Sequence, residues 1–278
     1  MLDYERVTAP PSLTRTGSGE PLLLLHGLGT SRRDFTAVLP ALTDRFDVIN
    51  VDLPGIARSP HLEQRPTVAA ITDAIEHTLD AEGLGRVHVL GNSLGARIAL
   101  ELAVRGRARS AVAIGPSGLN IPQERLYQGA SMGLARIVMR AAKPLITSVC
   151  RSAAGRAALL APLKARPWST SPEEAIGVRE GFAESRDFWR TVLWALMLDV
   201  PRSLDRIDCP VTLVQGVADW VACGQTVRYL PLIPGSRFSP LLMAGHAPQS
   251  DRPATIARLV EETAARAAGR TATLRAIA

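Results

Sequence analysis

Three side chains that stand far apart in the sequence have the types that nucleophilic catalysis needs. Ser93 lies in the segment Gly91-Asn92-Ser93-Leu94-Gly95, while Asp219 and His246 come much later in the chain. A serine hydroxyl is a weak nucleophile at neutral pH, so it needs a histidine as general base and a carboxylate that holds the histidine's tautomer. These residues predict acyl-transfer chemistry, with Ser93 as nucleophile, His246 as base and Asp219 as the orienting acid.

The residues on either side of Ser93 predict a strand, a sharp turn and a helix. Residues 87–90 are typical of a short buried strand, and residues 96–104 contain good helix formers with their apolar members on one stripe. A turn this sharp strains the serine backbone and leaves space only for small residues two positions away on either side. Gly91 and Gly95 occupy those positions, so we interpret the segment as a nucleophile elbow.

Strands and helices alternate along most of the chain. The strand candidates are residues 21–25, 46–51, 86–90, 110–114, 211–215 and 237–243, and helices are expected at 67–81 and 254–268. The first candidate strand is continuously apolar, as a strand buried on both sides should be. This alternation predicts a mostly parallel sheet with helices on both faces.

Asp219 and His246 each follow one of these strands, at the edge where ligands and catalytic groups of a parallel sheet collect. Three other acids precede the strand at 211–215 and would lie at the opposite edge, capping a turn or pairing with Arg202 or Arg206: Asp199, Asp205 and Asp208. Three other histidines are expected at the surface or in the core rather than as catalytic bases: His61, His77 and His88.

The loop after the first buried strand supplies a candidate oxyanion hole. It reads His26-Gly27-Leu28-Gly29. Acyl transfer develops negative charge on an oxygen, which backbone amides can stabilise. The amide of Leu94, just after the nucleophile, and that of Leu28 are the expected donors. His26 is expected to brace the loop by hydrogen bonding rather than to titrate in the reaction.

The alternation stops between Gly115 and about Val200, where helical periodicity continues without a convincing strand. Its length suits an inserted helical subdomain. Residues 171–174, Ser-Pro-Glu-Glu, predict a helix start, and that helix should run toward Trp194. Residues 116–200 hold eleven basic and seven acidic side chains. The side chains available to line an apolar pocket here are Tyr127, Met132, Met139, Trp168, Phe182, Trp189 and Trp194.

Five of these motifs together resemble the α/β-hydrolase fold, and specifically its members that carry a helical cap. They fall in the family's order along nearly the whole chain: residues 26–29, Asp52-Leu53-Pro54-Gly55, residues 91–95, residues 216–219 and Gly245-His246. The resemblance implies a hydrolase core at 1–115 and 201–278 with a cap at 116–200. Many relatives have Gly-x-Gly-x-Ser after Asp52, whereas this chain has Ala57 at the second glycine.

The resemblance implies a serine hydrolase that cleaves a small or medium carboxylic ester, thioester or lactone through an acyl-enzyme, without a metal or cofactor. Dehalogenases and epoxide hydrolases of the family use an aspartate nucleophile, so Ser93 disfavours their reactions. Asn92 and the cap are similar to hydrolases that cleave carbon-carbon bonds in ring-fission products, although Leu28 and Ala247 depart from that group. An acyltransferase, a cyclising enzyme and a slow-turnover binding protein stay open.

The composition argues against several other classes of protein. The chain has 278 residues, 46% of them hydrophobic, and a net charge of +6 that comes almost entirely from arginine. The basic residues are scattered without aromatic interleaving, which argues against nucleic-acid binding. The N-terminal residues do not resemble a secretory signal, no apolar run is long enough to span a bilayer, and three cysteines are too scattered for disulfides or zinc. We expect a cytoplasmic protein with a small-molecule substrate, and the oligomeric state stays open.

Overall fold

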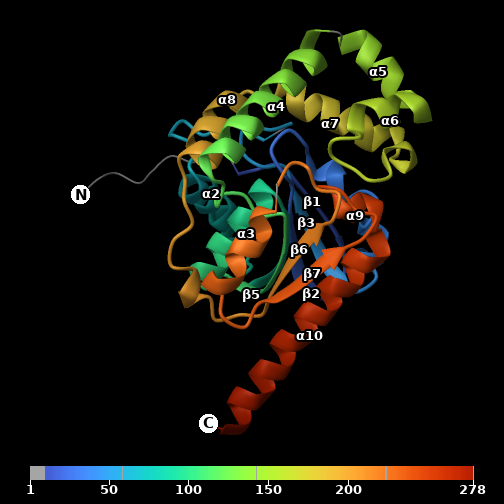
Figure 1. The fold of residues 1–278 in the computed structure, drawn as a ribbon. Coiled ribbons are helices and arrows are strands. Elements are labelled where there is room, and N and C mark those ends of the chain that lie inside the picture. The colour runs from blue at the N-terminus through green and yellow to red at the C-terminus, as the bar shows by residue number, and fades with distance from the viewer. Residues whose placement is uncertain (1–9, 58, 142, 223, 278) are drawn as a thin grey trace.

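A seven-stranded sheet forms the centre of the molecule (Figure 1). The computed structural model describes residues 10–57, 59–141, 143–222 and 224–277. The strand order is β1-β3-β2-β4-β5-β6-β7, with β1 antiparallel to β3 and the other neighbouring strands parallel. The strands are β1 (Leu13–Gly17), β2 (Glu20–Leu25), β3 (Phe46–Val51), β4 (Val87–Asn92), β5 (Ala108–Ile114), β6 (Val211–Gly216) and β7 (Arg237–Leu241).

The six predicted strands are confirmed to within a few residues at their ends, and with them the predicted fold class. The strand β1 was not predicted. This edge strand is exposed at all but its first residue, so it lacks the apolar pattern that marks a buried strand. Its Arg15 pairs with Asp47 of β3 at 2.6 Å. A polar, charged edge strand also disfavours pairing with a further strand.

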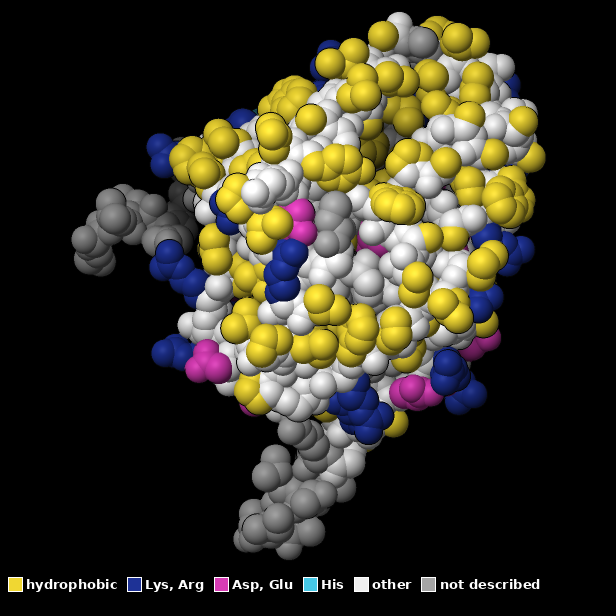
Figure 2. Space-filling model, viewed as in Figure 1, with side chains coloured by type: hydrophobic (Ala, Val, Ile, Leu, Met, Phe, Trp, Pro, Cys, Tyr) yellow, Lys and Arg dark blue, Asp and Glu magenta, His cyan; other side chains and the backbone are white. Residues whose placement is uncertain are grey.

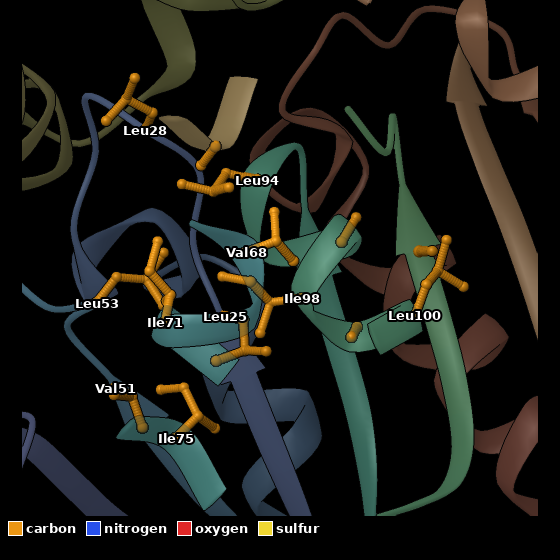
Figure 3. Packing of buried hydrophobic residues seen from close by; sticks show 14 of the residues in the cluster. Leu25, Leu28, Val51, Leu53, Val68, Ile71, Ile75, Leu94, Ile98 and Leu100 are labelled. Atoms are coloured by element: carbon orange, nitrogen blue, oxygen red, sulfur yellow. The ribbon is translucent and has the colours of Figure 1, made fainter. Parts of the chain in front are cut away.

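Each face of the sheet packs against its own set of helices. Because side chains alternate along a strand, Leu23 and Leu25 of β2 join the core on one face while Leu22 and Leu24 join the core on the other. The first core includes α2 (Val68–Ala81) and α3 (Leu94–Val104), whose Ile71, Ile75 and Ile98 are seen against the strands in Figure 3. The second core is closed by the short α1 (Leu39–Thr43) and the long α10 (Pro253–Ile277).

Short elements connect the main ones. They are η1 (Arg32–Phe35), η4 (Leu204–Arg206), η5 (Gln225–Leu232) and α9 (Pro248–Asp251). The helix α2 begins where the periodicity predicts it, since Thr67 accepts a hydrogen bond from the amide of Ala70 and so caps its first turn.

A layer of helices fills the stretch between β5 and β6 and lies over one edge of the sheet (Figure 1). It consists of α4 (Pro122–Ala141), α5 (Lys143–Arg151), α6 (Ala153–Leu160), η2 (Pro167–Ser169), α7 (Pro172–Glu184), α8 (Phe188–Thr191) and the π-helix η3 (Val192–Met197). We call residues 116–200 the helical layer. It packs on loops that follow the strands, because the amide of Arg186 donates to the carbonyl of Gly55 after β3.

The helix predicted to run from residue 171 toward Trp194 is shorter than expected. Ser171 caps α7 as predicted, by accepting from the amide of Glu174 at 3.1 Å, but α7 ends at Glu184. The buried guanidinium of Arg136 donates to the carbonyls of Phe182 and Ser185, so these carbonyls have a partner outside the helix. A side chain from α4 thus helps to end α7, which local sequence cannot predict.

Candidate active site

The turn that carries Ser93 has the strained geometry of a nucleophile elbow. Ser93 has φ 56° and ψ −112°, in a region that non-glycine residues rarely adopt, and it joins β4 to α3. A Cβ atom on Gly91 would lie 2.3 Å from the carbonyl oxygen of Gly95, and one on Gly95 would lie 2.0 Å from that of Leu25. Neither glycine can therefore be replaced without moving backbone, which is the physical reason for the spacing seen in the sequence.

Asp219 and His246 meet in a hydrogen bond of 2.9 Å between Oδ2 and Nδ1. Both side chains are buried. Burial alone would raise the pKa of Asp219, but the charge and hydrogen bond of His246 and the amides of Val221 and Ala222 outweigh it, so this pKa is lowered. Burial would lower the pKa of His246, yet the charge and hydrogen bond of Asp219 and the charge of Asp34 together outweigh burial and raise it. The pair thus favours a charged imidazolium beside a carboxylate.

The ends of β4, β5 and β6 bring this pair next to the elbow. The side-chain amide of Asn92 donates to the carbonyl of His246 at 2.8 Å. Gly115, directly after β5, lies against both members of the pair, since a Cβ atom on it would lie 3.2 Å from Asp219 Oδ2 and 3.3 Å from His246 Cε1. The hydrogen bonds among the described residues do not include one between Ser93 Oγ and His246, so that contact stays a prediction. Such bonds are often long without substrate.

The loop after β2 is built as the sequence suggests. His26 donates from Nδ1 to the carbonyl of Gly27 at 2.8 Å and accepts from the amide of Leu53 at Nε2 at 2.9 Å. Burial lowers the pKa of His26, so its neutral form braces the loops after β2 and β3. Among the described residues, no hydrogen bond occupies the amides of Leu28 or Leu94. Their role as oxyanion donors stays a prediction.

Two supporting residues lie behind the pair, and the sequence analysis did not identify either. Gln215, at the end of β6, donates to Asp219 Oδ2 at 2.9 Å and accepts from the hydroxyl of Thr226. Asp251 in α9 accepts from the amide of Gly245 at 2.8 Å, next to His246. A buried polar side chain just before a candidate acid is a signal that could have pointed to Gln215. No local pattern marks Asp251.

Asp251 also joins the histidine loop to the helical layer. Its carboxylate accepts from the amides of Ala165 and Arg166, each at 2.9 Å, and the amide of Ala247 donates to the carbonyl of Leu163 at 3.1 Å. Residues 163–166 are therefore fixed against the segment that carries His246. Movement of the helical layer relative to the sheet would disturb this connection.

A buried charged group lies beside the same segment. The ammonium of Lys164 donates to the carboxylate of Glu174 and to the hydroxyl of Ser250, the latter at 2.9 Å. Asp34 in η1 accepts from Gln249 at 2.8 Å, and burial raises the pKa of Asp34 to about 6 against the opposing charge of Lys164. His246 also interacts electrostatically with Asp34. Lys164, Glu174 and Asp34 thus lie near the histidine loop in addition to Asp251.

The competing candidates lie elsewhere. Asp199 pairs at 3.1 Å with Arg97, which lies in the first turn of α3 four residues after Ser93, so the expectation that Asp199 lies at the opposite edge of the sheet is wrong. Asp208 pairs with Arg86, just before β4, at 3.1 Å. Neither acid pairs with the arginines expected from the sequence. His88 is buried in β4 and bonds Ser110 at 2.8 Å, while His61 and His77 are exposed. None of these groups contacts the Asp219–His246 pair.

The predicted pocket-lining side chains divide into two groups. Phe182 is buried against the loop after β2, where a Cβ on Gly29, at φ 78°, would lie 2.6 Å from its ring. Met132 and Met139 are also buried, whereas Tyr127, Trp168 and Trp189 are about half exposed. Trp194 stacks under the guanidinium of Arg65 at 4.3 Å.

Further findings concern the described residues only. They contain no group of three or more His, Cys, Asp or Glu side chains able to hold a metal ion. None of their helices combines the length and apolar character needed to cross a bilayer. Cys150 and Cys209 are buried, and Cys223 lies outside the described residues. Cytoplasmic localisation stays a prediction.

Comparison with known proteins agrees with the fold. A model of the alpha/beta hydrolase family matches residues 22–259. The putative carbamate hydrolase RutD of Caulobacter sp. is 30% identical over 78% of this chain and 77% of its own length. The epoxide hydrolase EphH of Mycobacterium tuberculosis is 27% identical over 69% of this chain and 92% of its own length. Several other curated relatives match only locally, since the chain spans 26% to 40% of their length. A Thermogutta terrifontis esterase structure superposes with a TM-score of 0.69 at 22% identity, covering 90% of this chain and 91% of that one. This chain is therefore a hydrolase that belongs to the alpha/beta hydrolase family.

Proposed function

We propose that this hydrolase is a serine esterase that cleaves a small or medium carboxylic ester, thioester or lactone through an acyl-enzyme. His246 takes the proton of Ser93 as the hydroxyl attacks the acyl carbon, and it returns this proton to the leaving group. Asp219 stabilises the imidazolium. The amides of Leu28 and Leu94 hold the oxyanion, and water activated by His246 then releases the acid.

The observation that carries the proposal is the buried Asp219–His246 hydrogen bond beside a strained serine. The raised pKa of His246 fits a base that becomes an imidazolium during acyl transfer. Ser93 has a strained backbone, with φ 56°, and the small residues Gly91 and Gly95 leave room for this conformation. The strained turn projects the serine hydroxyl outward. Both features serve nucleophilic attack by serine.

Ester hydrolysis fits the site better than the alternatives. A serine nucleophile forms an acyl-enzyme from esters or carbamates, whereas opening an epoxide with it would leave a stable alkyl ether. Asn92, the residue that suggested carbon-carbon hydrolysis, uses its side-chain amide to hold the carbonyl of His246. That bond gives Asn92 a role in positioning His246 in any reaction that uses this triad.

We also propose that residues 116–200 act as a cap that selects the substrate. Phe182 of this segment packs on the candidate oxyanion loop, and residues 163–166 pack on the histidine loop. Figure 2 shows the surface hollowed between the upper helices and the core. Substrate selection would therefore depend on side chains of the cap that face Ser93.

The test combines a substrate panel with covalent trapping. The wild-type chain should hydrolyse p-nitrophenyl acetate or butyrate and should gain the mass of one phosphonyl group after treatment with a fluorophosphonate, on the peptide that contains Ser93. Ser93→Ala should lose the label and lower kcat by about 10⁵-fold or more. Ser203→Ala, which changes another serine with positive φ, is the matched control. Turnover by Ser93→Ala near the wild-type level would refute the mechanism.

A further inference from the structure

The exposed face of α4 is apolar, whereas its buried face carries Gln128 and Arg136 beside Met132 and Met139. Leu126, Leu134 and Ile137 are 76%, 63% and 63% exposed, and Leu145 of α5 is also exposed. An ordinary surface helix turns its apolar stripe toward the core and its polar residues toward water. We call the exposed residues Leu126, Leu134, Ile137, Val138 and Leu145 the α4–α5 ridge. Figure 2 shows hydrophobic side chains gathered over these two helices.

The polar groups on the inner face hold this orientation. Gln128 donates to the carbonyl of Val221 at 2.7 Å and accepts from Asn120 at 2.6 Å. Arg136 donates to two carbonyls of the α7 segment, and its guanidinium lies 4.6 Å from the ring centre of Phe188. Rotating α4 to bury its leucines would break these bonds. The apolar ridge is thus a fixed feature of the folded chain.

Positive charge predominates in the stretch that carries the ridge: Glu124 at the start of α4 is paired with Arg228, and of the basic side chains Arg136 and Lys164 are buried. Residues 125–172 contain eight basic side chains and no aspartate or glutamate. Arg140 and Arg151 are exposed at the ends of α4 and α5. Below them, in α7, Glu180 pairs with Arg33 and Glu184 pairs with Arg179. An apolar helix face with arginines at its ends is typical of helices that lie on an anionic bilayer surface.

We infer that the α4–α5 ridge binds the surface of an anionic lipid bilayer. The leucines and isoleucine insert among the acyl chains near the headgroups, and the arginines contact lipid phosphates. A second copy of this chain fits this face less well, because it would bring like charges together. The inference goes beyond the proposed function, and its test does not depend on turnover.

Vesicle sedimentation of the purified full chain tests the inference. Vesicles of phosphatidylcholine with about 40% phosphatidylglycerol should pellet the protein in 0.1 M salt, and pure phosphatidylcholine should pellet much less. High salt should release the chain, since screening weakens attraction to anionic lipid. Ser93→Ala should bind as the wild type does, so a failure of the esterase proposal would leave this result intact.

Substitutions locate the contact. Leu134→Glu with Ile137→Glu should lower the partition coefficient by at least about tenfold, because both side chains leave the apolar layer and add charge. Leu232→Glu, at an exposed leucine outside the ridge, is the matched control and should bind normally. Arg140→Gln should weaken binding to anionic vesicles by about fivefold. Arg258→Gln, on an exposed arginine of α10, should have no effect.

Three results would overturn the inference: no binding of the wild type to anionic vesicles, equal binding to neutral and anionic vesicles, or unchanged binding of the Leu134→Glu and Ile137→Glu double variant. Light scattering adds a fourth. A dimer of the wild type that the same double variant dissociates would mean that a second copy covers the ridge. Far-UV circular dichroism and the thermal unfolding midpoint of the double variant serve as a check that it is folded.

Discussion

The edge of the sheet and the helical layer above it are organised by different kinds of contact. At the edge, close backbone approaches at Gly91 and Gly95 fix where Ser93 can lie, and Gly115 leaves room for the side chains of Asp219 and His246. In the helical layer, single polar side chains such as Arg136 and Lys164 hold helices together through buried bonds. The first kind of contact leaves a motif in the sequence, and the second does not. Reaction chemistry is therefore easier to predict here than substrate.

Changes at the edge should abolish activity and spare stability. His246→Ala should lower kcat by about 10⁶-fold, since the general base is lost, while the midpoint of thermal unfolding changes by only a few degrees. Ester hydrolysis and calorimetry measure the two effects. His77→Ala, at an exposed histidine of α2, should leave both unchanged. If His246→Ala kept a tenth of the wild-type kcat, the edge would not be the catalytic region.

Asp219→Asn should lower kcat by about 10⁴-fold, because the asparagine cannot stabilise the imidazolium or hold its tautomer. The pKa of His246 is raised by Asp219, so kcat/KM of the wild type should rise with pH through a pKa above 6.5. This limb should move to lower pH in the variant. Asp199→Asn is the control and should be nearly normal, as Asp199 pairs with Arg97. Exchanged results for the two aspartates would refute the assignment of the acid.

Changes in the helical layer should instead lower stability and have less effect on the chemistry. Lys164→Met leaves the carboxylate of Glu174 buried without its cation, which should cost about 3–5 kcal/mol in the free energy of unfolding. Adding Glu174→Gln should recover much of that loss. Arg258→Met breaks an exposed ion pair with Glu262 and should cost under about 1 kcal/mol. Urea unfolding of the variants checks this, and equal costs for Lys164 and Arg258 would contradict it.

Asp34 lies where the two regions meet and should respond to pH. Its pKa is raised by burial to about 6, so the folded state holds its proton more tightly than the unfolded chain. Asp34 therefore costs stability above that pH and none below about pH 4. Asp34→Asn should raise the free energy of unfolding by about 1–3 kcal/mol at pH 8, with the gain lost by pH 4. A gain of equal size at both pH values would exclude the titration as its cause.

The smallest effect is expected at Ala57, in the loop after β3. Ala57 takes φ 50°, a conformation that favours glycine, at the position where many relatives have glycine. Ala57→Gly should stabilise the chain by about 0.5–1 kcal/mol because the strain is relieved. Thermal unfolding would detect the shift, and Ala130→Gly on the exposed face of α4 should instead destabilise. A loss of stability at both positions would contradict this reading of the loop.

The sequence by itself determined where six strands lie along the chain, the elbow around Ser93 and the positions of Asp219 and His246 beyond strand ends. These follow from local rules, since an apolar run, a pair of glycines and a capping serine act within a few residues. It also predicted that His26 braces its loop, which the bonds to Gly27 and Leu53 confirm.

Only the tertiary structure decided what supports these groups and how the helical layer is arranged. Gln215 behind Asp219, Asp251 behind His246, and the end of α7 at Glu184 each depend on a partner from another part of the fold. The apolar outer face of α4 is equally hidden in the sequence, where a helix with apolar residues on two sides does not tell which side is buried. Such features depend on contacts between distant residues, whose energies local patterns do not encode.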